Sequence, residues 1–156
     1  MPDETPPTAF PADSLMARLA AYEQRAAALI PANKANLFAA LADAGITSVT
    51  VMFDSSGDSG QIESIGAKAG ESVVALPDTP VEIAHTEFFS DDIHRRSLPL
   101  PEAVESLCYL LLESKHDGWE NNEGAYGEFV FDVANDSIAF DFNYRIETSE
   151  NHTYQF

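Results

Sequence analysis

The hydrophobic positions of this chain follow a helical period in three segments. In the first segment, apolar residues recur every three or four positions, which places them on one face of an α-helix. These residues are Leu15, Leu19, Tyr22, Ala26 and Leu29. Asp13 or Ser14 offers the side-chain oxygen that caps a helix start, and Pro31 is expected to end this first helix.

A second helix is predicted from Asn33 to Ala44, with Asn33 as its N-cap and Gly45 just past its end. Its inward residues are Leu37, Phe38 and Leu41. In the third helical segment, Pro101 stands where a first helical residue is expected, and Gly118 closes the helix. The apolar stripe of this third helix is Val104, Leu107, Leu111 and Leu112.

Period-two alternation near the end of the chain predicts a β-hairpin. Segments 127–133 and 137–147 alternate apolar and polar residues around a short turn at 134–136. The side chains predicted to point inward are Phe129, Phe131, Val133, Ile138, Phe140, Phe142 and Tyr144. Apolar and β-branched residues predict earlier strands, which are expected at 46–53, 61–69, 71–76 and 80–89.

The order of these elements predicts the fold class. Two helices precede a run of neighbouring strands, without the regular alternation of strand and helix that a parallel sheet requires. The prediction is an α+β fold with two N-terminal helices, a mostly antiparallel sheet and one further helix before a C-terminal β-hairpin. The proline-rich residues 1–13 are interpreted as a flexible lead-in to a single domain over residues 14–156.

Charge is the strongest signal in the composition. The 156 residues include 26 Asp and Glu against 8 Lys and Arg, which gives a net charge of −18. This balance disfavours direct binding to nucleic acid or to an anionic membrane, and it favours a basic protein partner or cations. The single cysteine, Cys108, lies among leucines and is predicted to be buried and inert. With no signal-peptide pattern and no membrane-length apolar stretch, a cytoplasmic location is expected.

The stretch DSSGDSGQIE, residues 54–63, concentrates acidic and polar side chains directly after an apolar run. A phosphate cradle is rejected because Asp58 lies in its middle and the first lysine after the loop begins is Lys68. A calcium or magnesium loop would take oxygen ligands from Asp54, Ser56, Asp58 and Glu63, although the EF-hand spacing is not met. We therefore favour a structured turn, with a cation site as the alternative.

A second polar stretch, GWENNEGAYGEF, spans residues 118–129. It is interpreted as a packed connection or, alternatively, as a shaped loop that carries function. The residues that would complete a cation site with the first loop are Trp119, Glu120, Asn121, Asn122 and Glu123. The four histidines are scattered and no nucleophile or zinc motif is present in the sequence, so no catalytic residue is assigned and a non-enzymatic role is favoured.

Carboxylates form a spaced row on the predicted solvent side of the final hairpin, since residues two apart lie about 6.6 Å along a strand. Asn143 and Arg145 are expected on the same side. Together with acids from nearby segments, this row gives a candidate partner-binding surface of Asp91, Asp92, Glu102, Glu105, Glu128, Asp132, Asp141 and Glu147. One hypothesis is that this surface mimics nucleic acid and occupies a basic groove; the alternative is a merely solvated charged face.

Two motifs together, FDSSGDSGQIESI at 53–65 and GWENNEGAYGEFVFDVANDSIAFDFN at 118–143, resemble a family of small uncharacterised domains from bacterial chromosomes and mobile elements. The resemblance covers residues 35–156 and implies a bacterial or phage-related setting. It brings no assigned activity, cofactor or catalytic residue. Ser55 departs from the glycine that many members have at this position.

The leading hypothesis from the sequence is an acidic, non-enzymatic interaction protein that inhibits or regulates a basic nucleic-acid-handling or defence protein. The alternative is a ligand-binding domain or enzyme that depends on a divalent cation. Its site would combine the loop at 54–63 with the loop at 119–124.

Overall fold

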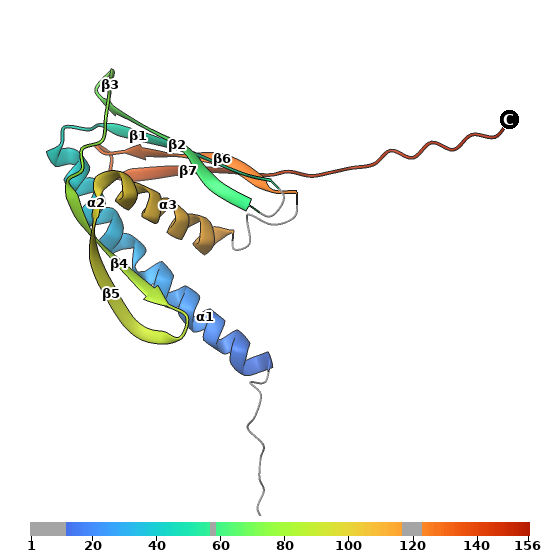
Figure 1. Ribbon diagram of the computed structural model, residues 1–156, viewed down its shortest axis with the longest axis horizontal. Coiled ribbons are helices and arrows are strands. Elements are labelled where there is room, and N and C mark those ends of the chain that lie inside the picture. Colours follow the sequence, from blue (N-terminus) through green and yellow to red (C-terminus); the bar gives the residue numbers. More distant parts are fainter. Residues whose placement is uncertain (1–11, 57–58, 117–122) are drawn as a thin grey trace, which may run out of the picture.

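The computed structural model describes residues 12–56, 59–116 and 123–156. The predicted lead-in therefore lies almost entirely outside the described residues. Figure 1 shows a β-sheet with helices packed against one face and a long β-hairpin beyond them. This arrangement confirms the predicted α+β class with a mostly antiparallel sheet.

The first two helices, α1 (Ala12–Ala28) and α2 (Ile30–Asp43), join at Leu29 as one bent helix. α1 ends at Ala28, three residues before the predicted end at Pro31, and Pro31 itself stands in the first turn of α2. A proline is tolerated there because a first-turn N–H has no partner within the helix. At the other end, Gly45 has φ +77°, and the amides of Gly45 and Ile46 close the helix, as predicted.

Asn33 is not the N-cap that the sequence predicted. It is buried inside α2, and its amide group makes two hydrogen bonds with the backbone of Ala84. Asn33 Nδ2 donates to the Ala84 carbonyl oxygen and Asn33 Oδ1 accepts from the Ala84 N–H, each over 2.9 Å. Asn36 Nδ2 donates to the Glu82 carbonyl oxygen over 3.1 Å. Side chains of α2 thus satisfy the backbone along one edge of strand β4 (Pro80–Glu87).

In the part of the chain that the structure describes, the main sheet has five antiparallel strands in the order β3-β2-β1-β6-β7. Their bounds are β1 (Ser48–Ser56), β2 (Ser59–Ala69), β3 (Ser72–Val74), β6 (Ala125–Asp132) and β7 (Ser137–Tyr144). The predicted final hairpin is present, and its inward side chains contact the core with one exception. The exception is Tyr144, which is exposed.

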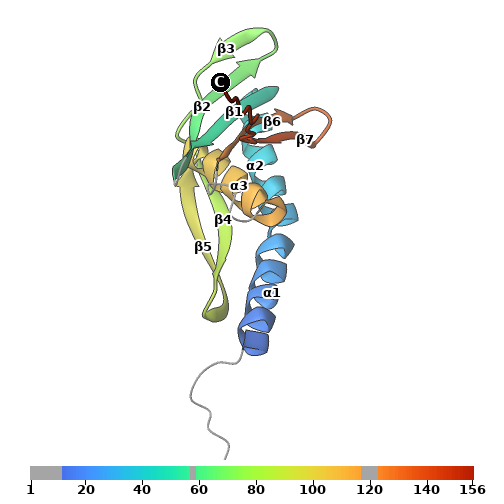
Figure 2. The same ribbon diagram turned by 90° about the vertical axis from the view of Figure 1, so that its right-hand side faces the viewer.

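Strands β4 and β5 (Ser90–Pro99) form a separate two-stranded sheet. The sequence did not predict β5. Nearly all of its side chains are exposed, so it lacks the apolar alternation that reveals a half-buried strand. Helix α1 lies beside this hairpin (Figure 2), where the Tyr22 and Phe88 rings are 5.8 Å apart and Arg25 lies 3.4 Å from the Asp91 carboxylate.

The core lies between the sheet and the helices α2 and α3 (Leu100–Lys115). Pro101 lies in the first turn of α3, as predicted, whereas Gly118 lies outside the described residues. Cys108 is fully buried, and this burial raises the pKa of its thiol well above the usual value. Within the described ranges, no helix is both long and apolar enough to span a membrane.

Candidate functional site

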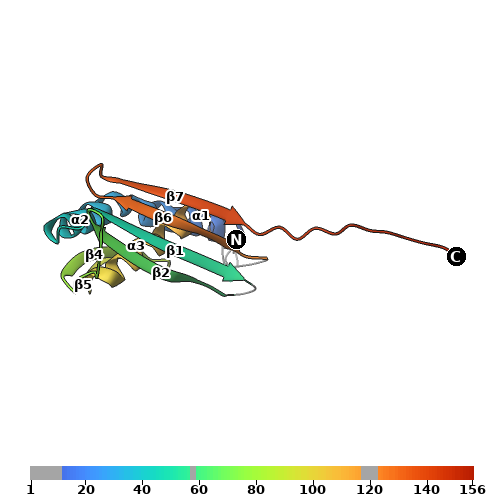
Figure 3. The same cartoon turned by 90° about the horizontal axis from the view of Figure 1, so that it is seen from above.

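One face of the main sheet carries no helix among the described residues, and Figure 3 looks down onto it. Because side chains alternate along a strand, the neighbours of the buried Phe53, Phe129 and Phe131 point to this side. The register places the outward residues in cross-strand rows. These rows are Gln61–Asp54–Tyr126–Asn143, Ser64–Met52–Glu128–Asp141, Gly66–Thr50–Val130–Ala139 and Lys68–Ser48–Asp132–Ser137. We call this surface the open sheet face.

On the β6–β7 side of the open sheet face lie two directly opposed carboxylates, Glu128 on β6 and Asp141 on β7, which we call the acidic pair. Asn143 Nδ2 donates to Asp141 Oδ2 over 3.2 Å. Within the described residues, none of the ion pairs involves either member of the acidic pair. Like charges directly opposite across strands destabilise a sheet, so this pair is poorly explained by folding alone.

Apolar side chains flank the acidic pair. Met52 is the cross-strand neighbour of Glu128 on the other side and is 52% exposed, and Tyr126 is 45% exposed. The open sheet face therefore combines negative charge with accessible methionine and tyrosine surface. Aromatic residues and methionine are enriched where proteins meet their partners.

A second group of residues lies at the end of the open sheet face where β1 leads into the first polar loop. Arg145 Nη2 lies 2.9 Å from Asp54, and Arg145 Nη1 donates to the carbonyl oxygens of Ser55 and Ala125. The guanidinium also lies 4.9 Å from the centre of the Tyr126 ring. We call these five residues the Arg145 cluster. It ties the ends of β1, β6 and β7 together.

Ser55 adds a buried hydroxyl to the Arg145 cluster. Its Oγ accepts from the Ala125 N–H over 2.9 Å and donates to the Ala125 carbonyl oxygen over 3.3 Å. This hydroxyl satisfies backbone groups at the start of β6, where the ladder to β1 stops at Asp54 and Tyr126. Ser55, which departs from the glycine of many resembling chains, thus has a local structural role here.

The first polar loop connects β1 and β2 as a hairpin, with Ser56 paired to Ser59 across it. Residues 57 and 58, including the predicted ligand Asp58, lie outside the described residues, and so does the Ser56 side chain. Glu63 lies on β2 at a register shift opposite Met52 and Phe53, and it accepts a 3.4 Å hydrogen bond from Gln61. The Asp54 carboxylate is already bound by Arg145.

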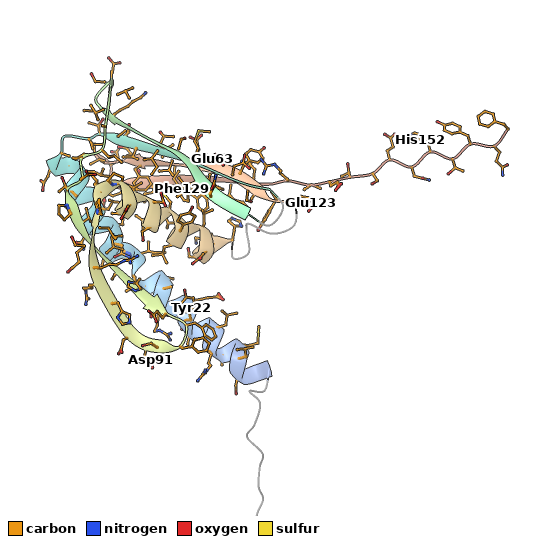
Figure 4. All side chains as sticks on the ribbon, in the orientation of Figure 1. Tyr22, Glu63, Asp91, Glu123, Phe129 and His152 are labelled. Atoms are coloured by element: carbon orange, nitrogen blue, oxygen red, sulfur yellow. The ribbon has the colours of Figure 1, made fainter. Side chains whose placement is uncertain are left out.

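The second polar loop enters β6 at the same end of the sheet, because Ser55 bonds to Ala125. Glu123 is exposed, and Figure 4 labels it at this end of the sheet. The other predicted ligands of this loop, residues 119–122, lie outside the described ranges. Among the residues that the structure describes, no three His, Cys, Asp or Glu side chains gather closely enough to hold a metal.

The predicted anionic surface is divided over several parts of the molecule. Asp91 and Asp92 lie at the start of β5, far from the main sheet, and Figure 4 labels Asp91 there. Glu102 and Glu105 are exposed on α3, which packs against the opposite face of the sheet. Glu147 lies beyond the end of β7.

Asp132 shares the open sheet face with the acidic pair but is engaged by Asn135. The amide side chain and the backbone N–H of Asn135 donate to this carboxylate over 2.8 and 3.2 Å. These bonds lower the pKa of Asp132 below its usual value, with the side-chain bond as the larger cause. Of the eight acids predicted to form the partner-binding surface, only Glu128, Asp132 and Asp141 lie on the strands of the open sheet face.

Sequence reasoning missed the Arg145 cluster, since Arg145 was expected in the solvent-facing row and is instead half-buried. One signal was available. Arg145 is the only basic residue after Lys115, in a stretch rich in acids. A lone cation in such surroundings is expected to find a carboxylate partner, although the pattern alone does not say which one.

Fold and surface together define an acidic α+β domain with an uncovered antiparallel sheet face. Residues 29–156 match a family of unknown function (DUF6878), and the chain belongs to this family. The match begins at Leu29, where α1 and α2 join. No curated protein and no solved structure matches the chain.

Proposed function

We propose that this chain is an acidic, non-enzymatic interaction protein of the bacterial cytoplasm that binds a basic protein partner through the open sheet face. The partner class is a nucleic-acid-handling or defence protein, whose basic groove the sheet face occupies in place of nucleic acid. The observation that carries the proposal is the acidic pair, directly opposed on a helix-free face and outside every ion pair among the described residues.

The acidic pair suits an arginine or lysine from a partner. Directly opposite residues in an antiparallel pair have Cα atoms about 4.5–5.5 Å apart, so one guanidinium can contact both carboxylates. The cation would relieve the repulsion between Glu128 and Asp141 and thereby gain affinity. Met52 and Tyr126 supply apolar contact beside the pair.

Because the predicted acids lie on separate parts of the molecule, only some of them can belong to a surface that mimics nucleic acid. Asp91, Asp92, Glu102 and Glu105 lie away from the open sheet face and contribute only to its long-range field. That field speeds association with the basic partner, while the open sheet face makes the short-range contacts with it. The cation-dependent alternative is less favoured by the geometry because Asp54, the first carboxylate of the loop, is bound by Arg145.

A pair of matched variants tests the proposal. Glu128→Gln with Asp141→Asn removes two charges from the open sheet face, and Glu102→Gln with Glu105→Gln removes two charges from α3. Binding of a fluorescent arginine-rich peptide is measured for both at about 0.01 M and about 0.15 M salt, where the Debye length falls from about 30 to about 8 Å.

We expect the sheet variant to weaken binding by at least about tenfold, while the α3 variant loses only the modest long-range contribution. We also expect wild-type binding to weaken strongly with salt. Equal losses in both variants would show that only net charge matters and would refute the assignment to the sheet. A calcium requirement for binding would favour the cation-dependent alternative instead.

A further inference from the structure

The segment that follows β7, residues 145–156, runs straight away from the body and continues the direction of that strand (Figures 1 and 3). We call it the arm. Its amide at Arg145 donates to the Gly124 carbonyl oxygen over 2.9 Å. Beyond that bond, no backbone hydrogen bond of the described residues joins the arm to the body. Figure 4 shows His152 far from the sheet.

The arm has the side-chain pattern of a β-strand. The apolar residues of the arm all stand at even positions, as in β7, and its odd positions are all polar. The even positions are Ile146, Thr148, Glu150, His152, Tyr154 and Phe156. Ile146 is 81% exposed, Tyr154 is 72% exposed and Phe156 is fully exposed. Glu150 and His152, which lie 3.4 Å apart, interrupt this side between Ile146 and Tyr154. An extended segment with unpaired backbone groups is a template for strand pairing.

The free edge of β7 is the complementary surface. Within residues 12–56, 59–116 and 123–156, β7 is the last strand of the main sheet and pairs only with β6. The inward residues of the central strands, such as Phe129 and Phe131, are fully buried, whereas Phe140 and Phe142 on β7 are only half-buried. The apolar underside of the sheet is therefore incomplete at this edge. One more strand with apolar residues on the inner side would cover it.

We infer that two copies of this chain pair their β7 strands and arms in antiparallel fashion, so that the arm of each copy covers the β7 edge of the other. Such an isologous contact has a two-fold axis and repeats the same residue pairs on both sides. The arm of the same copy cannot reach its own β7 edge without a sharp reversal, because it extends in the direction of that strand.

Registers that set even positions opposite even positions keep the alternation on both sides of the sheet, and we choose the one that pairs the aromatic residues. It places Phe140 opposite Phe156 and Phe142 opposite Tyr154 on the inner side, and it places Thr148 opposite its own copy at the two-fold axis. Aromatic pairs at directly opposite positions are among the more favourable cross-strand contacts. In this arrangement the open sheet faces of both copies lie on the same side, so the dimer would present two acidic pairs to one partner.

Sedimentation of the full chain over a range of protein concentrations tests the inference. We expect a reversible dimer that strengthens with salt, because each copy carries a charge of −18 and added ions screen the repulsion. This salt response is opposite in sign to that expected for the basic partner, so the two proposals can fail separately. A monomer at every concentration and salt level would overturn the inference.

Matched arm variants locate the contact. Tyr154→Ser with Phe156→Ser removes the aromatic side of the arm, and Thr153→Ser with Gln155→Ser changes neighbouring residues on the polar side without altering charge. We expect the first variant to raise the dimer dissociation constant by at least about tenfold and the second to leave it near the wild-type value. Equal behaviour of the two variants would overturn the paired-strand arrangement. Circular dichroism confirms that both remain folded.

Disulfide trapping tests the register independently of affinity. Directly opposite Cα atoms lie about 4.5–5.5 Å apart, which is within disulfide reach, so Thr148→Cys should form a covalent dimer under mild oxidation. Glu71→Cys, an exposed position on the turn before β3, is the control and should remain monomeric. The native Cys108 is buried and does not compete. Crosslinking of Glu71→Cys alone, or of neither variant, would refute the proposed pairing.

Discussion

Replacement of Asn33 by serine separates two interpretations of the same residue. If Asn33 were a helix N-cap, serine would serve equally well and stability would hardly change. In the structure, Asn33 lies inside α2 and pairs both the N–H and the carbonyl of Ala84 through its amide group. A serine side chain is too short to replace both of these hydrogen bonds.

The expected loss of stability follows from the backbone groups of Ala84 that lose their hydrogen-bond partner. An unsatisfied buried donor or acceptor costs about 1–3 kcal/mol, so Asn33→Ala, which orphans both groups of Ala84, costs about 2–6 kcal/mol. The better helix propensity of alanine offsets up to about 0.7 kcal/mol of this cost. Asn33→Ser leaves at least one group unsatisfied, which costs about 1–3 kcal/mol. In a domain of this size, each kcal/mol lowers the melting midpoint by about 2–4 °C.

The assay is a thermal or urea melt followed by circular dichroism. Asn36→Ala is the matched control, since Asn36 lies on the same helix and makes a single exposed bond to Glu82. We expect this control to cost no more than about 1 kcal/mol. An Asn33→Ser protein that melts at the wild-type temperature would refute the edge-pairing role and restore the cap interpretation.

Three further predictions follow from individual side chains. Arg145→Lys keeps the charge but loses the planar fork that contacts Asp54 and two carbonyl oxygens, and we expect a loss of about 1 kcal/mol in a urea melt because the site is half-exposed. Cys108 should resist thiol reagents in the native protein and react only on unfolding, since burial raises its pKa. Asn135 lowers the pKa of Asp132. The stabilisation from this contact is therefore present above the usual aspartate pKa and is lost as the pH falls through the lowered pKa of Asp132. Asn135→Ala should raise the pKa of Asp132 in an NMR titration.

Several elements could be predicted from the sequence because their two sides differ in polarity. The β6–β7 hairpin alternates between apolar and polar residues at most positions, since one face meets the core and the other meets solvent. β5 could not be found in this way because both of its faces are largely exposed. Asn33 was misplaced because its function depends on Ala84, which is distant in the sequence and close only after folding.

The alternation of polar and apolar residues also explains why part of the candidate site could be predicted. Glu128 and Asp141 follow directly from the alternation of the last hairpin, and the structure adds that they are directly opposed. The Arg145 cluster depends on the meeting of three strand ends, which no local pattern encodes. Proximity in sequence likewise suggested one acidic surface, whereas the fold separates Asp91 from the sheet.

The measurement that tests the central claim most directly is an NMR titration of the 156-residue chain with an arginine-rich peptide, with amide shifts followed residue by residue. We predict that the largest shifts fall on Met52, Glu128 and Asp141 on the open sheet face, and that they diminish as salt is raised. Shifts centred on Asp91 or along α3, or shifts that salt leaves unchanged, would contradict an acidic partner-binding surface on this sheet.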